Sequence, residues 1–149
     1  MMGIVWSLLG VLAGGFIAMQ APINAQLAKE LGFPLAAAAA SFVAGTLALV
    51  LIMGVASQLQ GATIAWSAPP LWMLLAGGLL GAAYVMSIIV LTPRLGTAAT
   101  MAFIVTGQLL GGLVLDKLGY LGLAVRELTL GRVAGACLLL AGALLIRFT

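Results

Sequence analysis

Histidine is absent from this chain, and cysteine occurs once, at Cys137. A lone cysteine cannot form a disulfide within the chain, and without histidine the sequence offers no recognisable metal-binding pattern. The His–Cys and His–Asp pairs on which many enzymes depend are also excluded. We therefore expect no metal, no cofactor and no catalytic residues, and we do not expect an enzyme.

Charge is scarce as well. Lys, Arg, Asp and Glu make up 6% of the 149 residues, against about 25% in a soluble domain. The six basic and three acidic residues are scattered and give a net charge of +3, which argues against nucleic acid as a partner. With 64% hydrophobic residues and a mean hydropathy of +1.31, too little polar surface remains to cover a soluble core. The sequence predicts an all-α integral membrane protein, with the lipid bilayer as its surroundings.

Long apolar runs alternate with short polar segments. A helix needs about 20 residues to cross a bilayer, and five runs approach or exceed that length. We expect one transmembrane domain, 1–149, with spans at about 4–28, 34–57, 71–91, 97–115 and 131–146. The first run is too long and its start too poor in charge for a cleaved secretory signal.

Turn residues predict the connections between spans. Gly32 suits the end of the first helix, and Pro34 suits the first turn of the second. Residues 92–96 read as a tight turn between the third and fourth spans.

A few polar side chains lie at membrane depth. Gln20 and Asn24 are four residues apart and share a helix face, with Pro22 between them as an expected kink. Such groups are costly in hydrocarbon unless they are paired. They could form interhelical hydrogen bonds, but several amides in one small protein favour contact with a ligand. The candidate substrate-binding residues are Gln20, Asn24, Tyr84, Thr106 and Gln108.

Asp116 is the one acidic residue that adjoins a span. Proton-coupled transport usually needs a carboxylate inside the membrane, and no predicted span contains one. Asp116 stands at a helix end beside Lys117, where a local ion pair or a loop anchor is expected. We assign Asp116 and Pro22 structural or coupling roles.

The basic residues divide evenly between the two sides of the membrane. Five spans place the termini on opposite sides, and each side carries three basic residues, so the positive-inside rule assigns no orientation. One interpretation is a single orientation set by the 117–132 loop. The other is insertion in both orientations, giving an antiparallel homodimer. One side carries Lys29, Arg94 and Arg147, and the other carries Lys117, Arg126 and Arg132.

The depth of the amides bears on this choice. At a rise of about 1.5 Å per residue, Gln20 lies about 6 Å from the midplane on one side and Gln108 about 3 Å on the other. In an inverted pair of chains, the two amides fall within about 3 Å of each other in depth. This arithmetic favours a site that the fourth span of a second copy completes.

The sparse polar residues form a recognisable pattern. Its residues are Gln20, Pro22, Asn24, Leu27, Gly107, Gln108, Asp116, Gly119, Gly122, Leu128, Thr129, Leu130, Arg132, Gly135 and Gly142. Over essentially the whole chain, the sequence resembles the small YdcZ-type branch of the drug/metabolite transporter superfamily. The resemblance implies a five-helix inner-membrane protein, related to half of a ten-helix transporter of inverted repeats. The four-helix multidrug members differ, because the first span here has no glutamate, so their proton-coupled chemistry is not carried over.

We therefore expect a small inner-membrane transporter that moves a small organic solute or metabolite by alternating access. It would work as a homodimer, antiparallel or not, or as a pair with a homologous subunit. The alternative is a non-transporting accessory or assembly subunit of the membrane, whose polar residues only join helices. Intramembrane hydrolysis would need a nucleophile with a base or paired acids, and the spans contain neither.

Overall fold

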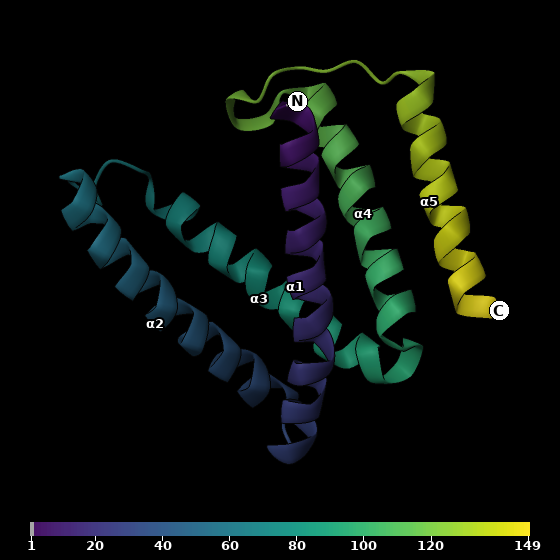
Figure 1. The fold of residues 1–149 in the computed structure, drawn as a ribbon, viewed down its shortest axis with the longest axis horizontal. Helices are drawn as coiled ribbons and strands as arrows, with labels where there is room; N and C mark the ends of the chain where they lie inside the picture. Colours follow the sequence, from purple (N-terminus) through teal and green to yellow (C-terminus); the bar gives the residue numbers. More distant parts are fainter. Residues whose placement is uncertain (1) are drawn as a thin grey trace. The chain divides into compact units, whose positions relative to one another are not determined.

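A computed structural model describes residues 2–149, with side chains from residue 3 onward. This part of the chain folds into five α-helices and one short 3-10 helix (Figure 1). The elements are α1 (Met2–Glu30), α2 (Pro34–Gln60), α3 (Leu71–Leu95), α4 (Thr97–Leu118), η1 (Tyr120–Gly122) and α5 (Leu130–Phe148). Each of the five α-helices is long and apolar enough to cross a membrane. The predicted all-α membrane fold with five spans is confirmed.

The chain divides into two compact units, one up to Val90 and the other from Leu91 to Thr149. The boundary falls inside α3, so the first unit holds α1, α2 and most of α3. The second holds the end of α3 together with α4, η1 and α5. The expectation of one transmembrane domain stays a prediction.

Small residues bring the helices of the first unit together. Gly32 adopts the left-handed conformation, with φ of 67°, and Pro34 opens α2 as expected. The short turn between them returns α2 beside α1. Alanine side chains permit close approach between helices, and the buried cluster here is built mainly from them. Its members are Ala28, Ala37, Ala38, Val85 and Ile89, with Leu27, Tyr84 and Met86 packed against it.

The helices run further than the sequence suggested, and the prediction of a turn at 92–96 is wrong. α3 continues through Pro93 to Leu95, and the break falls at Gly96, with φ of 83°. A proline removes one backbone donor but its fixed φ suits a helix, and membrane helices tolerate it. The amide of Gly96 closes the last turn by donating to the carbonyl of Thr92 at 2.9 Å. Pro22 likewise lies inside an uninterrupted α1.

In the second unit, α4 and α5 lie side by side, joined by residues 119–129 (Figure 1). Gly119 turns the chain with φ of 60°. The amide of Arg126 then donates to the carbonyl of Asp116 at 2.9 Å, which folds the connection back onto the end of α4. Thr129 caps α5 by accepting a hydrogen bond from the amide of Arg132 at 3.4 Å. The connection thus fixes where α5 begins relative to α4.

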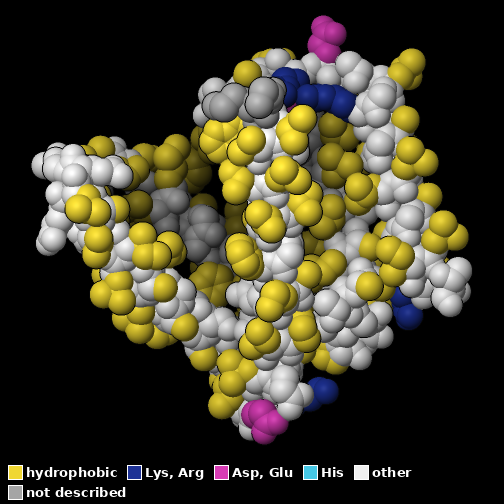
Figure 2. Space-filling view, in the orientation of Figure 1, with side chains coloured by type: hydrophobic (Ala, Val, Ile, Leu, Met, Phe, Trp, Pro, Cys, Tyr) yellow, Lys and Arg dark blue, Asp and Glu magenta, His cyan; other side chains and the backbone are white. Residues whose placement is uncertain are grey.

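Apolar side chains cover the lengths of the helices, and charged side chains gather toward helix ends (Figure 2). Many large apolar residues are exposed, for example Val11 at 73% and Leu51 at 71%. Exposed apolar patches of this extent mark an interaction surface. On spans of this length, the surface that they suit is lipid.

Candidate functional site

Asn24 joins α1 to α2. Its side chain is 3% exposed, and its carboxamide oxygen accepts a hydrogen bond from the hydroxyl of Ser41 at 2.5 Å. A polar pair inside an apolar helix pair satisfies groups that hydrocarbon could not. Asn24 is therefore an interhelical contact in this unit, and its oxygen is already occupied.

Gln20, one turn earlier on α1, is exposed. It lines a groove of about 220 Å³ together with Ser41, Gly45 and Thr46 of α2 and Val85 of α3. Its carboxamide has no hydrogen-bond partner among the side chains that the structure describes. Gln20 lies about four residues past the middle of α1, or about 6 Å along the helix axis. An unpaired amide at this depth is costly in hydrocarbon.

Tyr84 and Thr106 have local roles. Tyr84 is half-buried and packs against the alanine-rich cluster of the first unit. Thr106 is 3% exposed, and its hydroxyl donates to the carbonyl of Ala102 in its own helix at 2.8 Å. Threonines in helices commonly satisfy their hydroxyl in this way. Thr106 therefore offers no free donor to a ligand, whereas the Tyr84 hydroxyl has no hydrogen-bond partner among the described residues.

Gln108 belongs to a groove between α4 and α5. The groove has a volume of about 470 Å³ and is lined by Gln108, Gly112 and Asp116 of α4 and by Arg132, Gly135 and Leu139 of α5. Residues 108, 112 and 116 follow at intervals of four and so share one face of α4. Glycines at 112 and 135 add no side chain, which leaves room between the helices. The Gln108 carboxamide, like that of Gln20, has no partner within residues 3–149.

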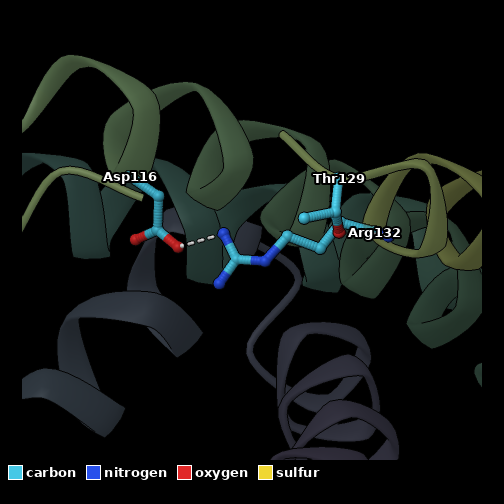
Figure 3. A network of polar contacts seen from close by, with 3 residues as sticks. All are labelled: Asp116, Thr129 and Arg132. Carbon is cyan, nitrogen blue, oxygen red and sulfur yellow. Dashed lines mark hydrogen bonds and ion pairs between the residues drawn. The ribbon is translucent and has the colours of Figure 1, made fainter. Parts of the chain in front are cut away.

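An ion pair closes the other end of this groove (Figure 3). Nη1 of Arg132 lies 3.2 Å from Oδ2 of Asp116, and the two side chains are 30% and 37% exposed. The partner of Asp116 is thus Arg132 of α5 and not the neighbouring Lys117. Successive residues on a helix do not face each other, and Lys117 lines a separate apolar groove on the other side of the α4–α5 pair.

The predicted site residues therefore fall into two groups. Gln20, Asn24 and Tyr84 lie in the first unit, and Thr106, Gln108 and Asp116 lie in the second. Sequence reasoning had not singled out Ser41 and Thr46 beside Gln20, or the pairing of Arg132 with Asp116. The spacing of Gln108 and Asp116, eight residues apart and so on one face of α4, is a signal in the sequence that could have pointed to this second group.

The chemistry that these groups support is binding by hydrogen bonds and charge. Within the described residues, no three His, Cys, Asp or Glu side chains lie close enough to hold a metal ion. In the second unit a guanidinium, a carboxylate and the Gln108 carboxamide can orient a polar solute, and in the first unit the Gln20 carboxamide can do so. They supply no nucleophile with a base beside it.

Comparisons with known proteins identify a family for the chain. The profile of a family described as "Putative inner membrane exporter, YdcZ" matches residues 5–145. The "Inner membrane protein YdcZ" of Escherichia coli (strain K12) is 41% identical over 75 residues, which are 50% of this chain and 50% of that protein. The matched part thus spans half of the length of this curated relative. No solved structure matches the chain.

Proposed function

Because this chain belongs to the YdcZ family of inner membrane exporters, within the drug/metabolite transporter superfamily, we propose that it exports a small organic solute by alternating access. The family and the five apolar helices make it a multi-pass protein of the inner membrane. Membership confirms the resemblance noted in the sequence. The solute, the transport cycle and the assembly belong to the proposal.

The observation that carries the proposal is that the carboxamides of Gln20 and Gln108, on apolar helices, have no hydrogen-bond partner among the described residues. Each lines a groove with further polar groups. A carboxamide offers two donors and an acceptor. Moving such a group from water into an apolar solvent, without hydrogen bonds, costs on the order of several kcal/mol. A polar solute that passes through the membrane would supply the missing partners. Asn24 and Tyr84 in the first unit and Thr106 in the second would support these grooves without lining them.

We propose further that the transporter works as a dimer. Five helices correspond to half of a ten-helix carrier of inverted repeats, and the balanced basic residues suit two chains of opposite orientation. The depths of Gln20 and Gln108 in the membrane do not favour an antiparallel dimer over a parallel one. The observed bounds place Gln108 near the middle of α4, so inverting one copy brings it no nearer in depth to Gln20.

Efflux from proteoliposomes tests the transport. Purified protein is reconstituted into vesicles loaded with a defined mixture of small amino acids, hydroxy acids, sugars and amines, and the released solutes are measured by mass spectrometry. Faster release of one class than from protein-free vesicles is the expected result. Gln20→Ala and Gln108→Ala should slow that release, whereas Gln26→Ala, an exposed amide bonded to Glu30 at 2.7 Å, should not.

Two outcomes would count against this function. Release equal to that of protein-free vesicles, together with a stable complex with another membrane protein, would favour an accessory subunit. Release that is unchanged in both alanine variants would remove the carboxamides from the site. Tagging each terminus and mapping its side of the membrane tests the dimer separately, and a uniform orientation would exclude the antiparallel form.

A further inference from the structure

We propose that the groove between α4 and α5 binds the carboxylate of a small solute at Arg132, with Asp116 holding the guanidinium when the solute is absent. This inference rests on the proposed function and names the chemical class of its substrate. The solute would carry a carboxylate at one end, an aliphatic middle and a hydrogen-bonding group at the other end.

Arg132 has binding capacity to spare. A guanidinium carries five N–H donors, and the structure gives the Arg132 side chain a single contact, from Nη1 to Oδ2 of Asp116 at 3.2 Å. Arginine binds carboxylates most strongly through two parallel hydrogen bonds. Asp116 does not form this two-bond arrangement with Arg132. A second carboxylate can therefore bind the guanidinium beside Asp116 or in its place.

The spare binding capacity of the groove suits an anion. Its charged lining residues are Asp116 and Arg132. The Asp116 carboxylate already accepts from Arg132, whereas most of the five N–H donors of the guanidinium lie outside that single contact. Both side chains of the ion pair are about one-third exposed and lie near the end of α4, so a carboxylate could reach them without full loss of its water.

The rest of the groove fixes the shape of the solute. Gln108 stands eight residues before Asp116 on the same face, a distance of about 12 Å along the axis. This separation of positions along α4 sets the scale of the solute, and a chain of about six carbons is a probe of that scale. Gly112 and Gly135 give the chain room, and Leu139 lies along it. The volume of about 470 Å³ is within the range of small-molecule sites.

Binding of 6-hydroxyhexanoate to the purified full-length protein in nanodiscs tests the proposal. Radiolabelled 6-hydroxyhexanoate is measured against 1,6-hexanediol and 6-amino-1-hexanol, with empty nanodiscs as the blank. The acid should bind and the diol and the amine should not. Arg132→Gln should raise the Kd by about tenfold or more, as for loss of a charged hydrogen bond, and Arg132→Lys should retain part of the affinity.

Asp116→Asn separates a binding site from a structural ion pair. If Asp116 competes for the guanidinium, removing its charge should lower the Kd for the acid by about threefold to tenfold. Lys117→Gln, one residue away in the opposite groove, should leave the Kd unchanged. Equal loss of thermal stability in Arg132→Gln and Asp116→Asn, with no acid bound by any variant or by the original protein, would overturn the proposal.

Preference for 6-amino-1-hexanol, abolished by Asp116→Asn, would overturn the proposal as well.

The binding site and the export function can be disproved independently of each other. Acid that binds but is not released from proteoliposomes would leave this site in place and contradict the export function. Release of another solute class by protein that does not bind the acid would support the export function and contradict this site.

Discussion

The hydroxyl of Ser41 donates a 2.5 Å hydrogen bond to the carboxamide oxygen of Asn24, and so joins α2 to α1 between buried alanines. Gln20, one turn away on the same helix, has no partner among the described residues. Two amides that look alike in the sequence therefore have different tasks. One holds two helices together, and the other faces a groove.

Ser41→Ala should destabilise the protein more than removing both partners at once. Alone, it leaves the buried oxygen of Asn24 unpaired, which costs about 1–3 kcal/mol. In the double variant Asn24→Leu/Ser41→Ala no polar group is stranded, and the loss should approach the value of about 0.6 kcal/mol typical of membrane hydrogen bonds. Unfolding in mixed micelles by SDS measures both. A double variant as unstable as Ser41→Ala would contradict the interhelical role.

Thr100→Val should stabilise the protein by about 1 kcal/mol. Thr100 is fully buried, and its hydroxyl has no hydrogen-bond partner within the part of the chain that is described. Replacing a stranded hydroxyl by a methyl group removes its desolvation penalty. Thr106→Val is the matched control, because that buried hydroxyl is bonded to the carbonyl of Ala102. SDS unfolding should show a gain for the first variant and none for the second.

Gly119→Ala should disturb the connection between α4 and α5. An added Cβ would lie 2.7 Å from Cγ2 of Val125, and φ at this residue is +60°. Strain of this kind costs about 1–3 kcal/mol. At Gly122 φ is also positive, at +83°, but a Cβ would meet nothing within 4 Å, so Gly122→Ala carries the backbone cost alone.

The two glycine variants are compared by thermal unfolding in detergent. Gly119→Ala should lose more stability, and Val125→Ala in the same chain should recover part of the difference by clearing the contact. Equal losses at Gly119 and Gly122 would mean that the connection does not depend on the approach of Val125 to the end of α4.

The five helices could be predicted from apolar length alone, because a bilayer requires about 20 residues per span. Their ends could not. The sequence predicts that the second span ends at about residue 57, yet α2 continues to Gln60. A helix continues until a residue ends its backbone hydrogen bonding. Here that residue is Gly61, which adopts the left-handed conformation.

The site was harder to predict, for a physical reason. Gln20 and Asn24 differ by about 40° around α1, and that small rotation decides which of them meets Ser41. Since α1 is apolar on all sides, its sequence does not fix its rotation, and the fit of alanines against α2 does. The pairing of Asp116 with Arg132 depends likewise on the fold of residues 119–129, which places Arg132 opposite α4.

Gln20→Leu and Gln108→Leu provide the sharpest test of the two free carboxamides. Both residues are exposed on apolar helices and unpaired within residues 3–149, so leucine should leave the stability unchanged or raise it, because an unpaired amide in hydrocarbon carries a penalty. Transport should fall in the same variants, because the solute loses its hydrogen-bond partners. Proteoliposome efflux and SDS unfolding, measured on the same preparations, separate the two effects.

A variant of a structural amide such as Asn24 should lose stability and transport together. If Gln20→Leu and Gln108→Leu also lost both together, each amide would have a partner in the assembled protein, and the solute would have to bind elsewhere.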